Sequence, residues 1–133
     1  MKPWSHARNS AKNHGGKPED YIAIHEFFDS SKATFADMRH RSILHHSFGI
    51  FVAERVFGAC PTCGSCSGQR LPFMVNADGS KVQVRDIGEE HVIEDLGRIP
   101  SPQDYLIGMP LYHWIGGPAT RTERPKFISM KED

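Results

Sequence analysis

The chain has 133 residues, a length typical of a single domain with room for a hydrophobic core. Hydrophobic residues make up 38% of the chain and charged residues 24%, as in an ordinary soluble protein. The 16 basic and 16 acidic side chains give a formal net charge of zero, which argues against binding of nucleic acid by bulk positive charge. Eight histidines stand out, because several occupy positions where apolar residues are expected.

Neither a secretory signal nor a membrane span is expected. Residues 1–6 contain no apolar run after Lys2, and the longest uninterrupted apolar stretch, residues 49–53, is far too short to cross a bilayer. We therefore expect a soluble protein that stays in the cytoplasm and does not contact a membrane.

The first half of the chain predicts helices. A helix is expected over residues 5–14, with Ser5 as its N-cap. A second begins at residues 17–20, and the spacing of Ile24 and Phe28 places both on one face.

A third, long helix is predicted over residues 32–57 and ends at Gly58. At 100° per residue its apolar side chains form two stripes on nearly opposite sides, and a helix that is apolar on two sides is typical of the buried centre of a bundle. One stripe contains Phe35, Met38, Ile50, Ala53 and Phe57, and the other contains Leu44, Phe48 and Phe51.

The second half is more varied. A loop rich in Cys, Gly and Ser covers residues 59–70, and a β-hairpin is expected over residues 72–85, because Asp78-Gly79 suits a tight turn. Helices are predicted over residues 87–96 and 103–107.

These elements predict a mainly α fold: a small helical bundle around one long buried helix, with a β-hairpin inserted before the fourth helix (α+β). Residues 1–109 would form the single domain. Residues 110–133, rich in Pro, Gly and scattered charges, would form an extended tail whose Trp114 packs on the body or on a partner.

Histidines and carboxylates recur at helical spacings. His25 precedes Asp29 by four residues, and His91 precedes Asp95 by four, so each pair projects from one helix face. We expect several helices to direct imidazole and carboxylate groups into one interior site, with His25, His46 and His91 as metal ligands. Positions for supporting or anion-binding roles are His6, Asp29, Asp37, His40, Arg41, His45 and Asp95.

Two alternatives stay open for these residues. Each histidine taken alone is more often a core side chain with its hydrogen bonds satisfied than a ligand. Arginines such as Arg39, Arg41 and Arg98 could bind an anionic group, or could form salt bridges with Asp37 or Glu94. If the site binds a metal, zinc, iron and manganese all suit His and carboxylate ligands.

Three cysteines, Cys60, Cys63 and Cys66, lie within seven residues. The spacing resembles a zinc knuckle and predicts a structural zinc site whose fourth ligand is a histidine (His91 or His113), a carboxylate or water. Free thiols, a redox pair and an incomplete iron–sulfur motif are the alternatives.

Three sequence blocks carry a resemblance. They are Gly-Gly-Lys-Pro-Glu-Asp-Tyr at residues 15–21, Arg-His-Arg at 39–41 followed by His45-His46, and His-Val-Ile-Glu-Asp-Leu-Gly-Arg-Ile-Pro at 91–100. Over roughly residues 6–107 the chain resembles a small family of uncharacterised bacterial and phage proteins, described as a domain of unknown function.

The resemblance implies a single cytoplasmic domain of bacterial or phage origin, and it implies no activity. It also implies that the Cys-rich loop is an addition in this chain, because relatives join the long helix to the hairpin by a shorter link. The histidines that match the family pattern are His6, His25, His40, His45, His46 and His91.

Together these observations predict a small cytoplasmic metal-binding protein with an interior His/Asp cluster. If it is an enzyme, metal-assisted hydrolysis is the expected chemistry, with Arg41 holding an anion; a metal-free acid/base enzyme is a third reading. The main alternative is a non-enzymatic module that binds a host or phage protein and carries a structural zinc at the cysteines. The sequence does not indicate the oligomeric state.

Overall fold

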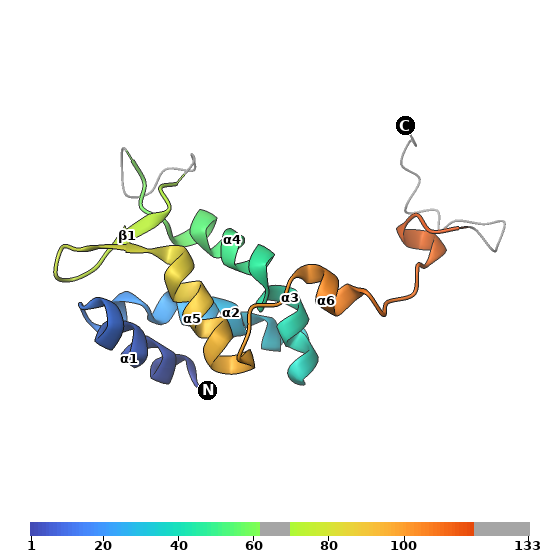
Figure 1. Cartoon of the computed structure of the whole chain (residues 1–133), viewed down its shortest axis with the longest axis horizontal. Coiled ribbons are helices and arrows are strands. Elements are labelled where there is room, and N and C mark those ends of the chain that lie inside the picture. The colour runs from blue at the N-terminus through green and yellow to red at the C-terminus, as the bar shows by residue number, and fades with distance from the viewer. Residues whose placement is uncertain (62–69, 119–133) are drawn as a thin grey trace.

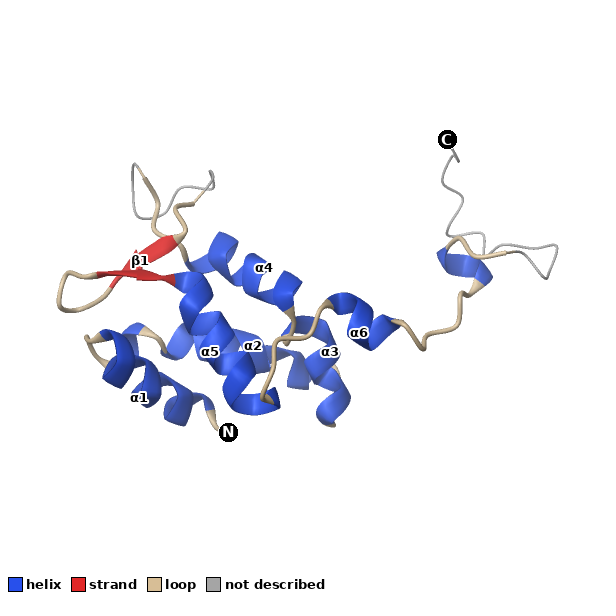
Figure 2. Cartoon of the chain, in the orientation of Figure 1, coloured by secondary structure: helices blue, strands red, loops and turns tan. Residues whose placement is uncertain are grey.

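The computed structural model describes residues 1–61 and 70–118 (Figure 1). It is mainly α-helical, with one two-stranded antiparallel sheet, as the sequence predicts (Figure 2). The α-helices are α1 (Pro3–His14), α2 (Ile22–Asp29), α3 (Arg41–Leu44), α4 (Ser47–Phe57), α5 (Val84–Leu96) and α6 (Pro102–Leu106). The strands are β1 (Phe73–Val75) and β2 (Lys81–Gln83), and short 3-10 helices are η1 (Pro18–Asp20), η2 (Ser30–Ala33), η3 (Met38–His40) and η4 (His113–Ile115).

Helix α5 is the centre of the fold. It packs against α1, α2, α4 and both strands, and its buried face includes Val84, Ile87 and Val92. Gly88 on this face lets the Phe28 ring approach, since a Cβ there would lie 3.0 Å from Cζ of that ring. The rest of the buried apolar core is Ala7, Tyr21, Ile24, Phe28, Ile50, Ala53 and Val82.

Helix α1 starts earlier than predicted. Pro3 is its first residue and Lys2 its N-cap, so the prediction that Ser5 caps this helix is wrong. A proline fits this first position because its missing N–H would have no partner inside the helix. The helix ends at Gly15, whose φ of 85° breaks the helical conformation and whose carbonyl accepts a hydrogen bond from Tyr21 Oη at 2.7 Å.

The predicted hairpin is confirmed. Strands β1 and β2 pair antiparallel with Met74 opposite Val82. Oδ1 of Asn76 accepts hydrogen bonds from the backbone N–H groups of Asp78 and Ser80, both at 3.0 Å, and so closes the turn. Because β2 runs directly into α5, the helix predicted over residues 87–96 begins at Val84.

The prediction of one long buried helix over residues 32–57 is wrong. The segment divides into the end of η2, η3, α3 and α4, with a corner at residues 45–46. Side chains cap the backbone at the breaks: Oδ1 of Asp37 accepts from Arg39 N at 2.8 Å, and Nδ1 of His46 accepts from Gly49 N at 3.0 Å. Such bonds offer the backbone an alternative to continuing a helix.

The division of this segment changes which side chains are buried. Phe35, Phe48 and Phe51, which the long helix would have buried, are exposed. The buried centre of the bundle is α5. The sequence pattern predicts a helix of ordinary length there, and it places the segment at residues 32–57 at the centre instead.

The C-terminal part leaves the body of the molecule. Helix α6 and η4 lead away from the bundle (Figures 1 and 2). Trp114 stacks on Tyr112 with ring centroids 5.5 Å apart and stays half exposed. Residues 119–133, most of the predicted tail, lie outside the described residues. Among the helices in the described ranges, none has the length and apolar character that spanning a membrane requires.

Candidate metal centre

Two helices contribute a histidine and an aspartate each, at the same spacing. His25 and Asp29 lie one turn apart on α2, and His91 and Asp95 lie one turn apart on α5. Because α2 and α5 pack against each other, both pairs enter the same interior space. The sequence predicted this arrangement from the i, i+4 spacing.

A fifth side chain, His45, enters from the corner between α3 and α4. Its ψ of 64° ends α3, and its carbonyl accepts a hydrogen bond from Tyr105 Oη at 2.9 Å. The corner is compact: His46 N donates to the carbonyl of Leu44 at 2.8 Å, and a Cβ on Gly49 would lie 1.9 Å from the same oxygen. The break in the predicted long helix is therefore what directs His45 inward.

Four side chains meet around one point. Asp29, His45, His91 and Asp95 each offer one donor atom, and the four atoms all lie within 4.8 Å of one another. Nε2 of His45 lies 3.2 Å from Nε2 of His91 and 3.0 Å from Oδ2 of Asp95. Nε2 of His91 lies 3.3 Å from Oδ2 of Asp95, and Oδ1 of Asp29 lies 3.5 Å from His91 Nε2 and 3.7 Å from His45 Nε2.

The four side chains are almost fully enclosed. The exposed fraction is zero for His45 and His91, 2% for Asp95 and 9% for Asp29. Oδ1 of Asp95 faces Nη2 of Arg41 at 4.0 Å and the amino group of Met1 at 3.3 Å, while its Oδ2 faces the two imidazoles. Buried carboxylates need a compensating positive charge, and this group could hold a metal ion.

Burial and neighbouring groups set the charge states. Burial, with the nearby His91 ring, lowers the pKa of His45 to about 4, and burial lowers the pKa of His91 as well. Burial alone would raise the pKa of Asp95, but the hydrogen bond from His45, together with the nearby His91 and His6 rings and the amino group of Met1, outweighs burial and holds that pKa at about 2. At neutral pH the cluster therefore presents neutral imidazoles and ionised carboxylates, which are the metal-binding forms.

A second group of histidines lies directly behind the first. His6, His25 and His91 also bring one ring nitrogen each within 4.8 Å of one another, and all three are fully buried. Nδ1 of His91 lies 2.9 Å from Nδ1 of His25, and Nε2 of His25 lies 2.8 Å from Oγ of Ser10. The His6 ring lies against the His91 ring in a tilted arrangement, with ring centroids 4.0 Å apart.

These contacts fix one order of protons when Nε2 of His91 binds a metal. His91 then carries its proton on Nδ1 and donates it to Nδ1 of His25. His25 in turn carries its proton on Nε2 and donates it to Oγ of Ser10. Histidines that bind metals usually donate their other ring N–H in this way, which orients the ring and raises its basicity.

His6 is held separately. Its Nδ1 lies 2.5 Å from Oε1 of Glu94, and Oε2 of Glu94 accepts from Asn9 at 3.1 Å. Nε2 of His6 lies 3.2 Å from Oδ1 of Asp95 without the alignment of a hydrogen bond. Other buried atoms without a hydrogen-bond partner in the described part of the chain are Nδ1 of His45, Oδ2 of Asp29, Nε of Arg41 and Oε1 of Glu90.

The structure brings together most, not all, of the residues singled out from the sequence. His46 does not join the cluster: its Nε2 lies 2.9 Å from the carbonyl of Ile43 and its Nδ1 caps α4, so local backbone bonds satisfy both nitrogens. Asp37 is exposed and forms a salt bridge with Arg39 at 2.7 Å, which is the alternative that the sequence offered to anion binding by this arginine. His40 borders the cluster, but its Nδ1 is bonded to Oγ of Ser31 at 3.0 Å.

The cysteine prediction concerns a region that is only partly described. Cys60 is disulfide-bonded in the structure, and in that state it offers no thiolate to a zinc ion. Cys63 and Cys66 lie outside the described residues, so the zinc site predicted at the three cysteines stays a prediction. His91, one of the candidates for its fourth ligand, is committed to the interior cluster.

Two supporting residues were missed by sequence reasoning. Ser10 lies one turn after His6 on α1, a spacing that could have placed it on the buried face. Glu94 was expected only as a salt-bridge partner of an arginine. Its contact with His6 joins residues 88 positions apart, and no local spacing indicates it.

Comparison with known proteins gives a family and nothing further. The profile of a family described as Domain of unknown function (DUF6915) matches residues 1–115. No curated protein and no solved structure matches the chain. The match confirms the resemblance to a family without an assigned function, while a bacterial or phage origin stays a prediction.

Proposed function

We propose that this chain, which belongs to the DUF6915 family, is a zinc-binding protein whose ion is a permanent structural part of the fold. The ligands in this proposal are Asp29, His45, His91 and Asp95. They come from α2, the corner between α3 and α4, and α5, so one ion would tie three parts of the chain together.

One observation carries the proposal: the spacing of the four donor atoms. The five separations given above range from 3.0 to 3.7 Å. Bonds of about 2.0–2.2 Å from Zn²⁺ to nitrogen and oxygen imply tetrahedron edges of about 3.3–3.6 Å. Five of the six edges between the donors thus have lengths close to those of a zinc-sized tetrahedron, and the sixth, between Asp29 and Asp95, is at most 4.8 Å.

Burial favours zinc over the other metals considered. Iron and manganese prefer more than four ligands and usually complete their coordination with water. Ligands that are at most 9% exposed leave little room for water, whereas structural zinc sites are closed and have four protein ligands. The same closure favours a structural ion over a catalytic one.

Metal content of the purified full-length protein tests the proposal. We expect one zinc per chain, retained in the double variant Cys60→Ser/Cys63→Ser and lost in Asp29→Asn and in Asp95→Asn. His46→Ala is the matched control, because His46 lies near His45 in sequence but outside the cluster. Far-UV circular dichroism checks that each variant folds. Zinc that disappears with the cysteines and persists in the folded aspartate variants would refute the proposal.

Chelation tests the structural role. Because the ion binds the folded chain and not the unfolded one, a free zinc concentration of about 100 times the Kd stabilises the fold by about 2.7 kcal/mol. We expect chelator to lower the melting temperature by roughly 10 °C and added zinc to restore it. A melting temperature that does not respond to removal of bound zinc would rule out a structural ion.

A second candidate, metal-assisted hydrolysis, is favoured by the edge of the site. Oδ2 of Asp29 and Nε of Arg41 have no hydrogen-bond partner in the described part of the chain, and Arg41 is partly exposed. If Asp29 moved aside, a metal-bound water and an anion on Arg41 could meet there. Hydrolysis of p-nitrophenyl phosphate in the presence of zinc or manganese tests this candidate. Activity that is lost in Arg41→Ala and kept in Arg39→Ala would support it. The absence of turnover with either metal would exclude it for phosphate esters.

A further inference from the structure

The end of the described chain forms an apolar arm. Residues 107–118, here the C-terminal arm, contain no Asp, Glu, Lys or Arg, in a chain of which 24% is charged. Leu111 is 66% exposed and Trp114 is 49% exposed, and Ile107, Met109, Tyr112 and Ile115 are exposed as well. Contiguous exposed apolar side chains on a soluble chain mark a contact surface.

A second apolar surface lies on α4. Phe48 is 58% exposed and Phe51 46% exposed, with their ring centroids 6.0 Å apart, and Val56, five residues after Phe51, is also exposed. We call these three residues the outer face of α4.

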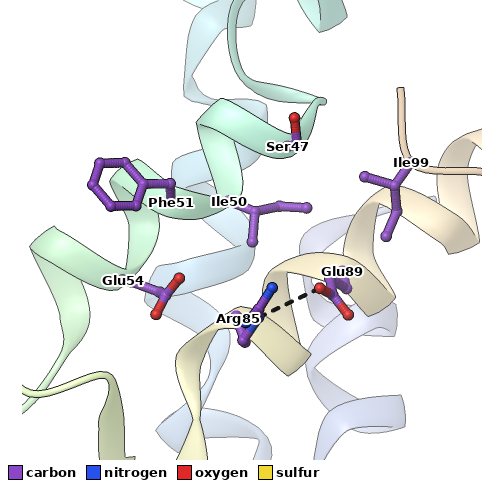
Figure 3. A pocket seen from close by; sticks show the side chains of 7 residues that line it. All are labelled: Ser47, Ile50, Phe51, Glu54, Arg85, Glu89 and Ile99. Carbon is purple, nitrogen blue, oxygen red and sulfur yellow. Dashed lines mark ion pairs between the residues drawn. The ribbon is translucent and has the colours of Figure 1, made fainter. Parts of the chain in front are cut away.

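A cleft of about 270 Å³ adjoins this face, between α4 and α5 (Figure 3). Its apolar lining is Ile50, Phe51 and Ile99, and the ion pair between Arg85 and Glu89, at 3.6 Å, borders it. The cleft is also lined by the polar side chains Ser47, Glu54, Arg85 and Glu89, so the apolar outer face has a polar border on this side. An apolar patch with a polar rim is the usual anatomy of a protein interface.

The chain passes the start of α4 before it reaches the arm. Ser47 N, at the start of α4, donates to the carbonyl of Pro100 at 2.9 Å, and from there the chain leads through α6 away from the bundle (Figure 1). Backbone hydrogen bonds within the arm, such as Gly117 N to Tyr112 O at 3.1 Å, hold it in its own shape. In this conformation the arm does not cover the outer face of its own α4.

We propose that two copies of this chain exchange C-terminal arms, so that the arm of each lies on the outer face of α4 in the other. A two-fold pair covers both surfaces at once, because every copy gives one arm and receives one. The match to the family profile runs to residue 115 and so includes most of the arm, which supports its being part of the domain.

The area available suits a stable dimer. If four half-exposed large side chains of each arm and a similar area of each receiving face become buried, the pair buries roughly 1,500 Å², the size of a standard protein interface. This inference does not depend on the metal. It commits to a second copy of the chain as the occupant, with Tyr112 and Trp114 covering Phe48 and Phe51.

Sedimentation velocity of the full-length protein over about 1–200 µM tests the exchange. We expect a dimer for the wild type. The arm variant Leu111→Ser/Trp114→Ser and the face variant Phe48→Ser/Phe51→Ser should each shift the monomer–dimer midpoint at least about tenfold, because large aromatic anchors dominate interfaces. Val75→Ser, an equally exposed apolar residue on the hairpin, is the control and should not shift it.

Mixing the two variants identifies the exchange. The face variant still has an intact arm and the arm variant an intact face, so one of the two contacts can form between them. We expect the mixture to give a heterodimer at concentrations where each variant alone is monomeric. A wild type that stays monomeric, a dimer that neither variant weakens, or a mixture that stays monomeric would each overturn the proposal. Unchanged circular dichroism and zinc content exclude unfolding as the cause.

Discussion

His91 uses both ring nitrogens, and its neighbours decide which one can bind an ion. Nε2 points at His45, Asp29 and Asp95, while Nδ1 is bonded to His25. The relay from His91 through His25 to Ser10 is complete inside the protein, since each N–H finds an acceptor. If an ion binds Nε2 of His91, Ser10 acts on it through His25 and His91 without contacting the ion itself.

This relay gives a prediction for Ser10→Ala. Loss of the hydroxyl leaves Nε2 of His25 without its acceptor, and loss of such supporting bonds typically weakens metal binding by about 10–100-fold. Competition with a zinc-binding dye measures the affinity. Ser5→Ala, on the exposed side of the same helix, is the control. An affinity unchanged in Ser10→Ala would contradict the proposed order of protons.

The buried histidines also predict how stability depends on pH in the metal-free protein. Burial, with the neighbouring His91 and His6 rings, lowers the pKa of His25 to about 3, and burial and His91 lower that of His45 to about 4. In the unfolded chain both titrate near 6.5. At pH values between the folded and unfolded pKa values, the unfolded chain binds protons that the folded chain does not. The free energy of unfolding therefore has its full value above about pH 6.5 and decreases as the pH is lowered to about 4.

Urea unfolding in the presence of chelator measures this dependence. One such histidine contributes at most about 1.4 kcal/mol per pH unit to the slope, so His25→Asn should reduce the slope between pH 6.5 and 4 by about that amount. A wild-type stability that is flat across this interval would contradict the burial of neutral imidazoles.

At the scale of elements, the corner between α3 and α4 decides the site. Helical periodicity predicts that His25 and Asp29 share one face of α2, and that His91 and Asp95 share one face of α5, because i, i+4 spacing is a local property. The same periodicity carried the helix through residues 45–46, made His46 a metal ligand and gave His45 only a supporting role. Capping of α4 by His46 and the approach of Gly49 to Leu44 reverse that assignment.

The remaining contacts of the site could not be predicted from spacing. His6 with Glu94, and His45 with Asp95, join residues that are far apart in sequence and meet only when α1, α3 and α5 pack. The composition indicates that the histidines are too many for an ordinary core, but their pairing depends on tertiary structure.

Gly49→Ala tests the corner. The new Cβ would lie 1.9 Å from the carbonyl oxygen of Leu44, a backbone atom that cannot turn away. We expect a loss of about 2–3 kcal/mol in the free energy of unfolding. Gly108→Ala, at a position with nothing within 4 Å of the added methyl group, should change it by less than about 0.5 kcal/mol. Equal stability of the two variants would show that the corner tolerates a side chain.

At the scale of the whole molecule, the fold is small, and its two neighbouring groups of histidines and aspartates occupy interior space: His6, His25, Asp29, His45, His91 and Asp95. An ion at the centre and a second copy at the surface would supply the stabilisation that the apolar core alone provides in larger domains.

Zinc K-edge X-ray absorption of the purified full-length protein tests the central claim most directly. The account predicts a first shell made only of nitrogen and oxygen, at about 2.0–2.1 Å, with the outer-shell scattering of two imidazoles. Bound zinc with sulfur neighbours at about 2.3 Å and no imidazole scattering would place the ion at the cysteines and contradict it.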